Sequence, residues 1–451
     1  MAIDLLLMTR LLVTRERVRR RDRWSRPQLL AYQQSALRRL LRHAATSSPY
    51  YRTLLSRGED TPLTDMPVLT KNALMDHWDE ICTTPDVRLV DVEGRMQELE
   101  QTAGDPGPAW RGRWWLAATG GTTGRRAVFA WDRREWTQVL ASYARVNDWA
   151  GVHVGLRDPL RTAIVSSLVP THQSAVVGAS LRSPLVPTLR LDAREPVARL
   201  AADLDRFNPR LLVAYASLVG PLAHAQLDGM LHVHPQKVVA ASEVLGADAR
   251  AAARLAWGED AVVDTYAATE TAGIASSCPQ GGWHVYEDFV IVEPVDDAGQ
   301  PVPPGTTSAR LLVTVLFSRT LPLIRYELTD SIRLAQTPCS CGLPFALLES
   351  VEGRSEDTIT LAGTQGPVRV HPNVFHAALE TAAPNGWQVE QQPDRLLIRL
   401  VEPGDTTRAR AQVQRALADL EVDLPVVDVV GVPALERTAL GKIRLVKALR
   451  S

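Results

Sequence analysis

The stretch from Thr119 to Arg126 holds the residues whose types point most directly to a chemical task. Its first six positions are three threonines and three glycines, and two arginines follow. A loop without bulky side chains can close around an anion, offering main-chain N–H groups and hydroxyls, while the arginines add positive charge. The spacing matches neither the Walker loop nor the dinucleotide-binding glycine pattern. Phosphate binding is therefore one interpretation, and a simple Gly/Thr turn before a strand is the other.

Further along, carboxylates and a lysine follow apolar runs or turns. Tyr266, Thr269 and Glu270 come at the end of an apolar run, which is where open α/β sheets bind ligands. Asp330 follows a second such run, and Lys442 follows a glycine near the end of the chain. When each residue is considered alone, the ordinary interpretation is an aromatic residue at a strand end, solvated carboxylates and a surface lysine.

Three of the four cysteines form a separate pattern with one histidine. Cys278 and His284 are separated by five residues, and Cys339 and Cys341 by one, in polar, turn-rich sequence. Thiolates with one imidazole are typical ligands of structural Zn²⁺, with no open position for catalysis. Buried free thiols are the alternative.

Length and composition limit the class of protein. With 451 residues, the chain exceeds the size at which a single core stops growing, so two or more domains are expected. Its 50 basic and 51 acidic residues nearly cancel, so no overall charge draws it to nucleic acid or membrane. No run approaches the roughly 18 apolar residues of a membrane span, and a secretory signal and a disulfide framework are not expected. The sequence therefore predicts a cytoplasmic protein without nucleic-acid or membrane partners.

The elements that must position these residues follow from the apolar pattern. The short apolar runs at 163–165, 211–213 and 238–240 predict buried strands. The Ala/Arg/Leu-rich segments 193–206 and 247–256 predict helices between them. This is an α/β organisation with a mainly parallel sheet.

The pattern changes in the second half of the chain. From residue 289, short apolar runs and Pro/Gly turns favour antiparallel strands. Near the end, a strand at 396–400 and a helix at 407–420 predict a small α+β unit. We therefore expect a large N-terminal domain (1–353) and a small C-terminal domain (354–451).

Together and in this order, the motifs resemble those of the adenylate-forming superfamily, the acyl-CoA synthetases and their relatives. The narrower likeness is to the phenylacetate-CoA ligase branch and extends from about residue 30 to 447. It is carried by further segments, namely 43–44, 49–51, 67–71, 284–288 and 322–326. The resemblance implies a large AMP-binding domain with mainly parallel sheets and a β-rich subdomain, and a small, mobile α+β lid domain.

The resemblance assigns the ATP phosphates to the glycine- and threonine-rich loop. The residues concerned are Thr119, Gly120, Gly121, Thr122, Thr123, Gly124 and Arg125. Relatives usually carry Lys-Pro where this chain has Arg125-Arg126, so the charge is kept but the flexible lysine is not.

The strand-end residues would then hold the rest of the nucleotide. By resemblance, Tyr266 packs on the adenine, Thr269 touches the α-phosphate and Glu270 holds Mg²⁺, a hard cation that prefers carboxylate oxygen. Asp330 accepts hydrogen bonds from both ribose hydroxyls, and Arg354 contacts ribose or phosphate.

The same resemblance makes the small domain mobile. Glu356 occupies the hinge at the domain boundary, and Lys442 bridges the acyl carboxylate and the α-phosphate. The resemblance also predicts an acyl site, lined by His172, Tyr215, Ser217, Ser242 and Glu243. For His172, an ordinary loop residue is the alternative interpretation.

The resemblance thus predicts an AMP-forming ligase that activates a carboxylic acid, aromatic or arylacetic, with ATP and Mg²⁺. Pyrophosphate is released, and the acyl group of the adenylate passes to a thiol, coenzyme A in the first place. One alternative changes the acceptor to a carrier-protein thiol, an amine or another small nucleophile. The other is a non-catalytic nucleotide-binding scaffold. The acid, the acceptor and the oligomeric state, a homodimer included, stay open at this point.

Overall fold

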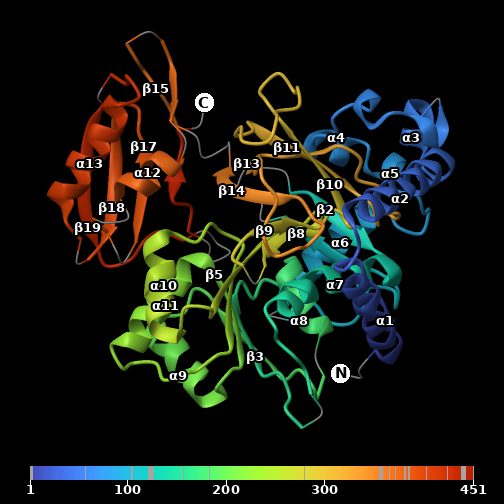
Figure 1. The fold of residues 1–451 in the computed structure, drawn as a ribbon, viewed down its shortest axis with the longest axis horizontal. Helices are drawn as coiled ribbons and strands as arrows, with labels where there is room; N and C mark the ends of the chain where they lie inside the picture. The colour runs from blue at the N-terminus through green and yellow to red at the C-terminus, as the bar shows by residue number, and fades with distance from the viewer. Residues whose placement is uncertain are drawn as a thin grey trace.

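The computed structural model combines a mixed α/β large domain with a small α+β domain, and confirms the predicted fold class (Figure 1). We call the residues up to the end of β14 (Leu347–Arg354) the large domain and the residues from Ile359 onward the small domain, while the boundary predicted between residues 353 and 354 stays a prediction. In Figure 1 the small domain, in red, lies at one side of the molecule, beside α10 (Ala216–Leu227) and α11 (Ala247–Trp257). The structure describes residues 4–55, 57–102, 105–119, 126–155, 157–181, 183–278, 280–354, 359–364, 366–370, 372–379, 382–383, 386–402, 404–423, 425–437 and 443–449.

Helices with defined caps form the start of the chain. The second of them opens with a capping box, in which the Ser25 hydroxyl accepts from the Gln28 amide and the Gln28 side chain accepts from the Ser25 amide. Ser48 separates it from the third helix and caps that helix by accepting from the Tyr51 amide. The elements are α1 (Leu5–Arg21), α2 (Arg26–Ser47), α3 (Pro49–Leu54), the 3₁₀ turns Gly58–Asp60 and Leu63–Asp65, α4 (Lys71–Asp76), α5 (Trp78–Ile81) and α6 (Leu89–Glu100).

A nine-stranded sheet, counted over the described residues, is the centre of the large domain. One half is parallel, in the order β7 (Val262–Ala268), β6 (Lys237–Ala241), β5 (Leu211–Tyr215), β3 (Thr162–Ser166) and β4 (Thr188–Asp192). The other half is antiparallel, in the order β8 (Ala272–Ser277), β9 (Trp283–Val285), β14 (Leu347–Arg354) and β13 (Asp330–Leu334). The predicted strands at 163–165, 211–213 and 238–240 are confirmed as β3, β5 and β6.

Helices connect the parallel strands, as expected for parallel strands, which need crossovers. They are α8 (Gln173–Ser180), α9 (Val197–Phe207), α10 and α11. The helix predicted at 193–206 begins later than expected, at Val197, because Pro196 precedes it as the N-cap residue. The helix predicted at 247–256 is confirmed as α11.

Two smaller sheets and one long helix complete the large domain. The antiparallel strands predicted after residue 289 are confirmed by β10 (Val290–Val295), β11 (Arg310–Val315) and β12 (Tyr326–Leu328). The other sheet pairs β1 (Trp115–Ala118) with β2 (Val128–Trp131), and α7 (Arg133–Trp149) follows it.

The small domain has a hydrophobic core of its own. Its α13 (Thr406–Ala418) buries Ala409, Val413 and Leu417 at four-residue spacing, while β18 (Arg395–Val401) buries every second residue. The core members found among the described residues run from Ile359 to Val446. The other elements are β15 (Ile359–Leu361), β16 (Val368–Val370), α12 (Pro372–Leu379), β17 (Trp387–Gln391), β19 (Val426–Val432) and β20 (Val446–Lys447).

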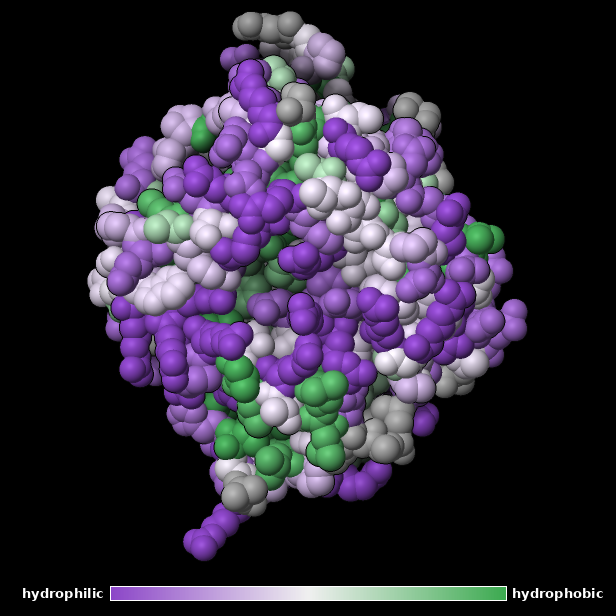
Figure 2. Space-filling view, turned by 90° about the vertical axis from the view of Figure 1, so that its right-hand side faces the viewer, coloured by the Kyte–Doolittle hydropathy of each residue, from purple (hydrophilic) through white to green (hydrophobic). Residues whose placement is uncertain are grey.

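The outer face of α1 is apolar. Leu5, Leu6, Leu12 and Val13 are exposed on it. Figure 2 looks onto this side of the molecule and shows apolar side chains gathered low in the view, over α1. Among the described helices, none has the length and apolar character that a membrane crossing requires.

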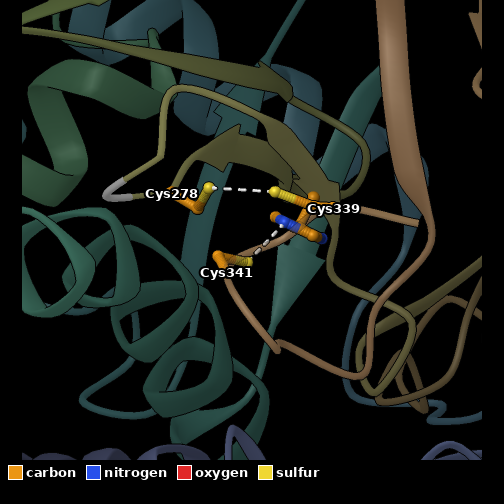
Figure 3. A group of neighbouring side chains, drawn as sticks. Cys278, Cys339 and Cys341 are labelled. Carbon is orange, nitrogen blue, oxygen red and sulfur yellow. Dashed lines mark hydrogen bonds between the residues drawn. The ribbon is translucent and has the colours of Figure 1, made fainter. Parts of the chain in front are cut away.

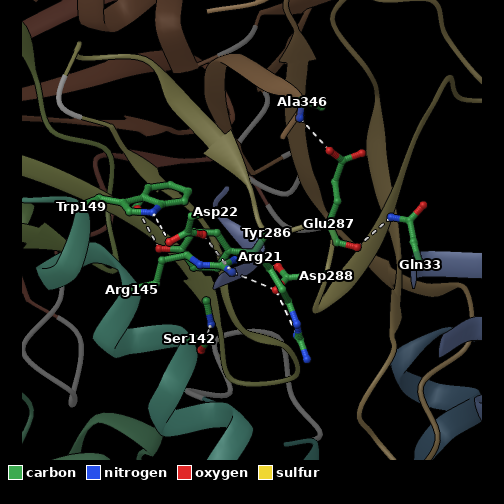
Figure 4. A network of polar contacts seen from close by, with 12 residues as sticks. Arg21, Asp22, Gln33, Ser142, Arg145, Trp149, Tyr286, Glu287, Asp288 and Ala346 are labelled. Carbon is green, nitrogen blue, oxygen red and sulfur yellow. Dashed lines mark hydrogen bonds and ion pairs between the residues drawn. The ribbon is translucent and has the colours of Figure 1, made fainter. Parts of the chain in front are cut away.

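A buried ion-pair network fastens α1 to the rest of the large domain (Figure 4). The Arg145 guanidinium, fully buried on α7, donates to both oxygens of the buried Asp288 carboxylate at 2.7 and 2.8 Å. Arg21, at the end of α1, donates to Asp288 at 3.1 Å, and the Trp149 indole donates to Asp22 at 3.1 Å. Burial alone would raise the pKa of the Asp288 carboxyl, but the two guanidinium groups outweigh it and hold that pKa below its usual value. The network therefore joins α1, α7 and the β9–β10 connection.

Replacing Arg145 by leucine removes the main partner of a buried charge. We expect Arg145→Leu to lower the free energy of unfolding by about 3–5 kcal/mol, measured by urea denaturation with tryptophan fluorescence. Adding Asp288→Asn should restore part of the loss, because it removes the uncompensated charge. The control Arg42→Leu breaks an exposed pair with Glu59 and should leave the midpoint nearly unchanged. An Arg145→Leu variant as stable as this control would contradict the role of the network.

Candidate functional site

The carboxyl ends of four parallel strands bring most of the predicted site residues to one edge of the sheet. Parallel strands run in the same direction, so the residues that follow them meet at the same edge, where open α/β sheets bind ligands. His172 follows β3, and Ser217 lies in the first turn of α10, directly after β5. The others are Tyr215 at the end of β5, Ser242 and Glu243 after β6, and Tyr266, Thr269 and Glu270 at or after the end of β7.

Tyr266 and Asp330 are joined by a hydrogen bond. The buried Tyr266 hydroxyl donates to Asp330 Oδ2 at 2.8 Å, although the two residues lie 64 positions apart. Asp330 begins β13 and is paired through its backbone with Arg354 of β14. Residues from three strands therefore converge at the place where the resemblance puts adenine and ribose.

The corner after β7 is held by polar contacts to neighbouring elements. The buried Glu270 carboxylate lies 3.4 Å from the Tyr326 hydroxyl, which donates to Oε1. Gln173 donates from Nε2 to the Thr269 carbonyl at 3.0 Å and accepts from the Tyr143 hydroxyl at 2.7 Å. Burial raises the pKa of Tyr143, and the nearby charge of Glu270 adds to this rise, so the phenol stays protonated and can donate. The contacts fix the position of a buried acidic group.

The base of the predicted phosphate loop lies next to this corner. The Thr119 amide donates to the Ala127 carbonyl at 2.9 Å, and the Ala127 amide donates to the Thr119 hydroxyl at 3.0 Å. The Ala118 amide donates to the carbonyl of Thr171, the residue before His172, at 2.8 Å. The described residues on either side of the loop, Thr119 and Ala127, therefore meet at the end of the β1–β2 pair, beside the start of α8. Its own residues Gly120, Gly121, Thr122, Thr123, Gly124 and Arg125 lie outside the described residues, as do Glu356 and Lys442.

The residues predicted for the acyl site are mainly involved in contacts within the protein. The buried Tyr215 hydroxyl accepts from the Ser167 amide at 3.0 Å, and burial raises the pKa of Tyr215 to about 12. The Glu243 carboxylate accepts from the Ser217 amide at 3.0 Å and from the Ile443 amide of the small domain at 3.1 Å. The roles expected for these residues toward an acyl group stay predictions.

Sequence reasoning missed Gln173, Tyr143 and Tyr326 as individual contributors. Gln173 follows the candidate His172 directly, so its position was a weak signal. Tyr326 ends one of the segments that carry the resemblance, but its contact with Glu270 spans 56 residues. No local pattern distinguishes Tyr143 from the other residues of α7.

The four predicted metal ligands lie together (Figure 3). Their candidate ligand atoms are all within 4.8 Å of one another. The sulfur atoms of Cys278 and Cys339 are 3.8 Å apart, and Cys341 Sγ lies 3.2 Å from His284 Nε2. A tetrahedral ion with Zn–S bonds of about 2.3 Å separates two sulfur atoms by about 3.8 Å, so the spacing fits Zn²⁺.

The surroundings of the cluster also suit a metal. His284 is buried, and its Nδ1 lies 3.0 Å from the Phe345 carbonyl, so an Nδ1–H donating there leaves Nε2 with a lone pair toward the thiols. Burial lowers the pKa of His284, which favours the neutral, ligating form. A Cβ on Gly282 would lie 3.1 Å from Cys339 Sγ, so glycine keeps this space open. The donor set and its environment therefore fit one structural ion.

Comparisons with known proteins show which proteins the chain resembles in sequence and in fold. Over 373 residues the chain is 24% identical to the phenylacetate-coenzyme A ligase of Thermus thermophilus, covering 78% of this chain and 76% of the relative. Its fold matches the crystal structure of 2-hydroxyisobutyryl-CoA ligase in the postadenylation state with a TM-score of 0.71, at 19% identity over 93% of this chain and 89% of the other. The chain is therefore similar in sequence to a phenylacetate-coenzyme A ligase and shares the fold of 2-hydroxyisobutyryl-CoA ligase.

The same 2-hydroxyisobutyryl-CoA ligase is also known in the thioesterification state, in complex with an acyl-adenylate and CoA. The present chain matches that structure with a TM-score of 0.59, at 20% identity over 95% of this chain and 91% of the other. No protein-family profile matches the chain.

Removing a metal ligand tests the zinc centre. Protein purified without a histidine tag should contain about one zinc per chain, and Cys339→Ser or Cys341→Ser should lower the zinc content and the melting temperature together. Cys82→Ser is the matched control, since this buried thiol lies outside the cluster and donates to the Thr84 carbonyl. Metal-free protein with an unchanged melting temperature would show that these are ordinary cysteines.

Proposed function

We propose that the chain activates a carboxylic acid with ATP and Mg²⁺ and transfers the resulting acyl group to coenzyme A. The observation that carries the proposal is the convergence of Tyr266, Asp330 and the Thr269–Glu270 corner beside the base of the loop at Thr119. These are the positions to which the superfamily resemblance assigns adenine, ribose, Mg²⁺ and phosphates. A ligase that is similar in fold has been solved with an acyl-adenylate and CoA, which supports the same sequence of steps here.

In the first step, a carboxylate oxygen of the substrate attacks the α-phosphorus of ATP. A C–O–P linkage forms, the bond to the β-phosphate oxygen breaks, and pyrophosphate leaves with its electron pair. In the second step the sulfur of the thiol attacks the acyl carbon, so a thioester forms and AMP leaves. Neither step needs a covalent enzyme intermediate, so the protein contributes by positioning the reactants and neutralising charge.

The nucleoside would be held by Tyr266 and Asp330. The Tyr266 hydroxyl already orients the Asp330 carboxylate, which can accept hydrogen bonds from ribose hydroxyls because each of its oxygens carries two lone pairs. The Tyr266 ring would pack on the adenine. Arg354, opposite Asp330 in the β13–β14 register, would contact ribose or phosphate.

The phosphates would be bound by the loop that begins at Thr119 and by the β7 corner. Glu270 is a buried acidic group in a site where a hard cation prefers carboxylate oxygen, so its chemistry fits Mg²⁺. Mg²⁺ bound there would neutralise phosphate charge beside Thr269. Lys442 would supply positive charge to the attacking carboxylate and the α-phosphate.

The substrate class rests on the relatives. Likeness to the phenylacetate-CoA ligase branch favours an aromatic or arylacetic acid, with His172 and its neighbours at the carboxyl edge as the acyl site. The ligase that is similar in fold bears the name of an aliphatic hydroxy acid, so both classes of acid belong in a substrate test.

We also propose that the small domain rotates between the two steps, about a hinge at Glu356. The separate core of the small domain supports movement as a rigid unit. Whole-chain similarity is greater to the postadenylation structure than to the thioesterification structure of the same ligase, with TM-scores of 0.71 and 0.59. Two arrangements of the small domain relative to the large domain would account for that difference.

Pyrophosphate release from a panel of aryl, arylacetic, fatty, hydroxy and amino acids, with and without coenzyme A, tests the proposal. We expect release with at least one acid, and Lys442→Ala to slow it by about two to three orders of magnitude, or about 3–4 kcal/mol of barrier. Lys447→Ala is the control, because this lysine of the same domain pairs with Glu436. Pyrophosphate release without thioester formation would move the acceptor to a carrier protein, an amine or another nucleophile. No release with any acid would favour a non-catalytic scaffold.

Asp330 offers a test of the nucleoside site. Asp330→Asn keeps an oxygen for the Tyr266 hydroxyl but loses charge and acceptor capacity toward ribose. We expect kcat/KM for ATP to fall about 10- to 100-fold, with the KM for the acid little changed. Tyr266→Phe keeps the ring and removes the hydroxyl that orients Asp330, so a smaller loss is expected. An unchanged kcat/KM for ATP in Asp330→Asn would place the ribose elsewhere.

A further inference from the structure

One carboxylate connects the two domains directly. Glu243 Oε2 accepts from the Ser217 amide of the large domain at 3.0 Å, and Oε1 accepts from the Ile443 amide of the small domain at 3.1 Å. The second contact joins residues 200 positions apart. Ile443 follows Lys442 in the sequence, so this interdomain bond lies next to the residue that the proposed function needs for adenylation.

The large domain holds Glu243 in place from both sides. Ser242, which precedes it at the end of β6, has a φ of +68°, a left-handed conformation that is unfavourable for serine. On the other side, Ser217 lies in the first turn of α10, where amide groups without helical partners and the helix dipole favour a negative charge. The carboxylate is therefore preorganised before the small domain arrives.

The small-domain partner of Glu243 is equally well anchored. Arg437 and Ile443 form an antiparallel bridge, so the chain on both sides of residues 438–442 is drawn together. The buried Gln388 of β17 donates from Nε2 to the carbonyls of Glu436 at 3.2 Å and Arg444 at 2.8 Å. The bridge is thus fixed to the core of the small domain, and its position follows the position of that domain.

Charge acts in the same direction as the hydrogen bond. Burial lowers the pKa of Arg437, and the nearby negative charge of Glu243 opposes this shift. Both ends of the bridge are therefore attracted to one carboxylate. Glu243 is half-buried, so water can replace the Ile443 amide when the domains separate, and the bond is reversible at modest cost.

We propose that Glu243 is a positioning residue that docks the Arg437–Ile443 bridge onto the large domain for the adenylation step and releases it for thioester formation. The inference rests on the proposed function, in which Lys442 acts in the first step. It gives Glu243 a task different from lining the acyl site, because both carboxylate oxygens serve backbone amides in this arrangement.

The two half-reactions separate this role from a purely structural one. Glu243→Ala should slow pyrophosphate release about 10- to 100-fold, with the KM for ATP within about threefold of wild type. Thioester formation from a presynthesised acyl-adenylate should stay within about threefold of wild type, since the contact is released in that step. Glu243→Gln should lose less, because its amide oxygen can still accept from one of the two amides.

Hydrogen exchange measured by mass spectrometry tests the hydrogen bond between Glu243 and the Ile443 amide without any substrate. The Ile443 amide should exchange faster in Glu243→Ala than in wild type, and Glu243→Gln should show a smaller change. Asp205→Asn is the matched control, because this carboxylate also accepts from a backbone amide, that of His232 at 2.7 Å, within the large domain. It should leave the exchange of Ile443 and both half-reactions unchanged.

Failures of the two proposals can be told apart. If wild-type protein releases no pyrophosphate with any acid, the proposed function is wrong, and exchange at Ile443 still decides whether Glu243 docks the small domain. If wild type is active but the Glu243 variants adenylate at its rate, or exchange at Ile443 is unchanged, the positioning role is wrong. Equal loss of both half-reactions together with a lower melting temperature would also overturn it, because that is the pattern of a structural residue.

Discussion

The common direction of four parallel strands is the constraint on which the site depends. Because β3, β5, β6 and β7 run the same way, the residues after each of them meet at one edge. Residues up to about a hundred positions apart, from His172 to Glu270, are thereby brought to the same edge, although no local sequence pattern shows that they lie together. The remaining site elements are added to this edge by the antiparallel half of the sheet, which brings Asp330 to Tyr266.

Buried polar groups then fix the elements that this edge requires. The zinc-compatible cluster joins β9 and the end of β8 to the β13–β14 connection, so it links the strands that start after Glu270 and at Asp330. The Trp149 ring packs edge-on against the His284 ring, with the ring centroids 6.0 Å apart. The Trp149 indole also donates to Asp22 in the Arg145 network. A continuous set of buried polar and aromatic contacts therefore runs from the N-terminal helices to the strands on which the proposed nucleotide site lies.

How far the sequence predicts this molecule depends on the range of each interaction. Buried parallel strands are continuous apolar runs in the sequence, so β3, β5 and β6 were predictable. A helix such as α13 was predictable from the spacing of its apolar residues. The cluster of Cys278, His284, Cys339 and Cys341 was predictable because few residue types share that ligand chemistry.

Single long-range polar contacts were not predictable, because they leave no periodicity. The bonds of Gln173 to Thr269 and of Glu243 to Ile443 join partners 96 and 200 residues apart, and each depends on one side chain of a common type. The resemblance led to Glu243 as an acyl-site residue, while the structure engages it between domains. Family motifs locate a residue at the site, but its partners come from the packed structure.

The independent core of the small domain has a thermodynamic consequence. The described core members from Ile359 to Val446 form a cluster of their own, so the small domain can unfold separately, and contacts such as Glu243–Ile443 link its folding to that of the large domain. In such an arrangement, unfolding need not be a single cooperative transition. A nucleotide held by residues of both domains would bind only the state in which both domains are folded. Its binding free energy would then link the two unfolding transitions, so that they merge into one.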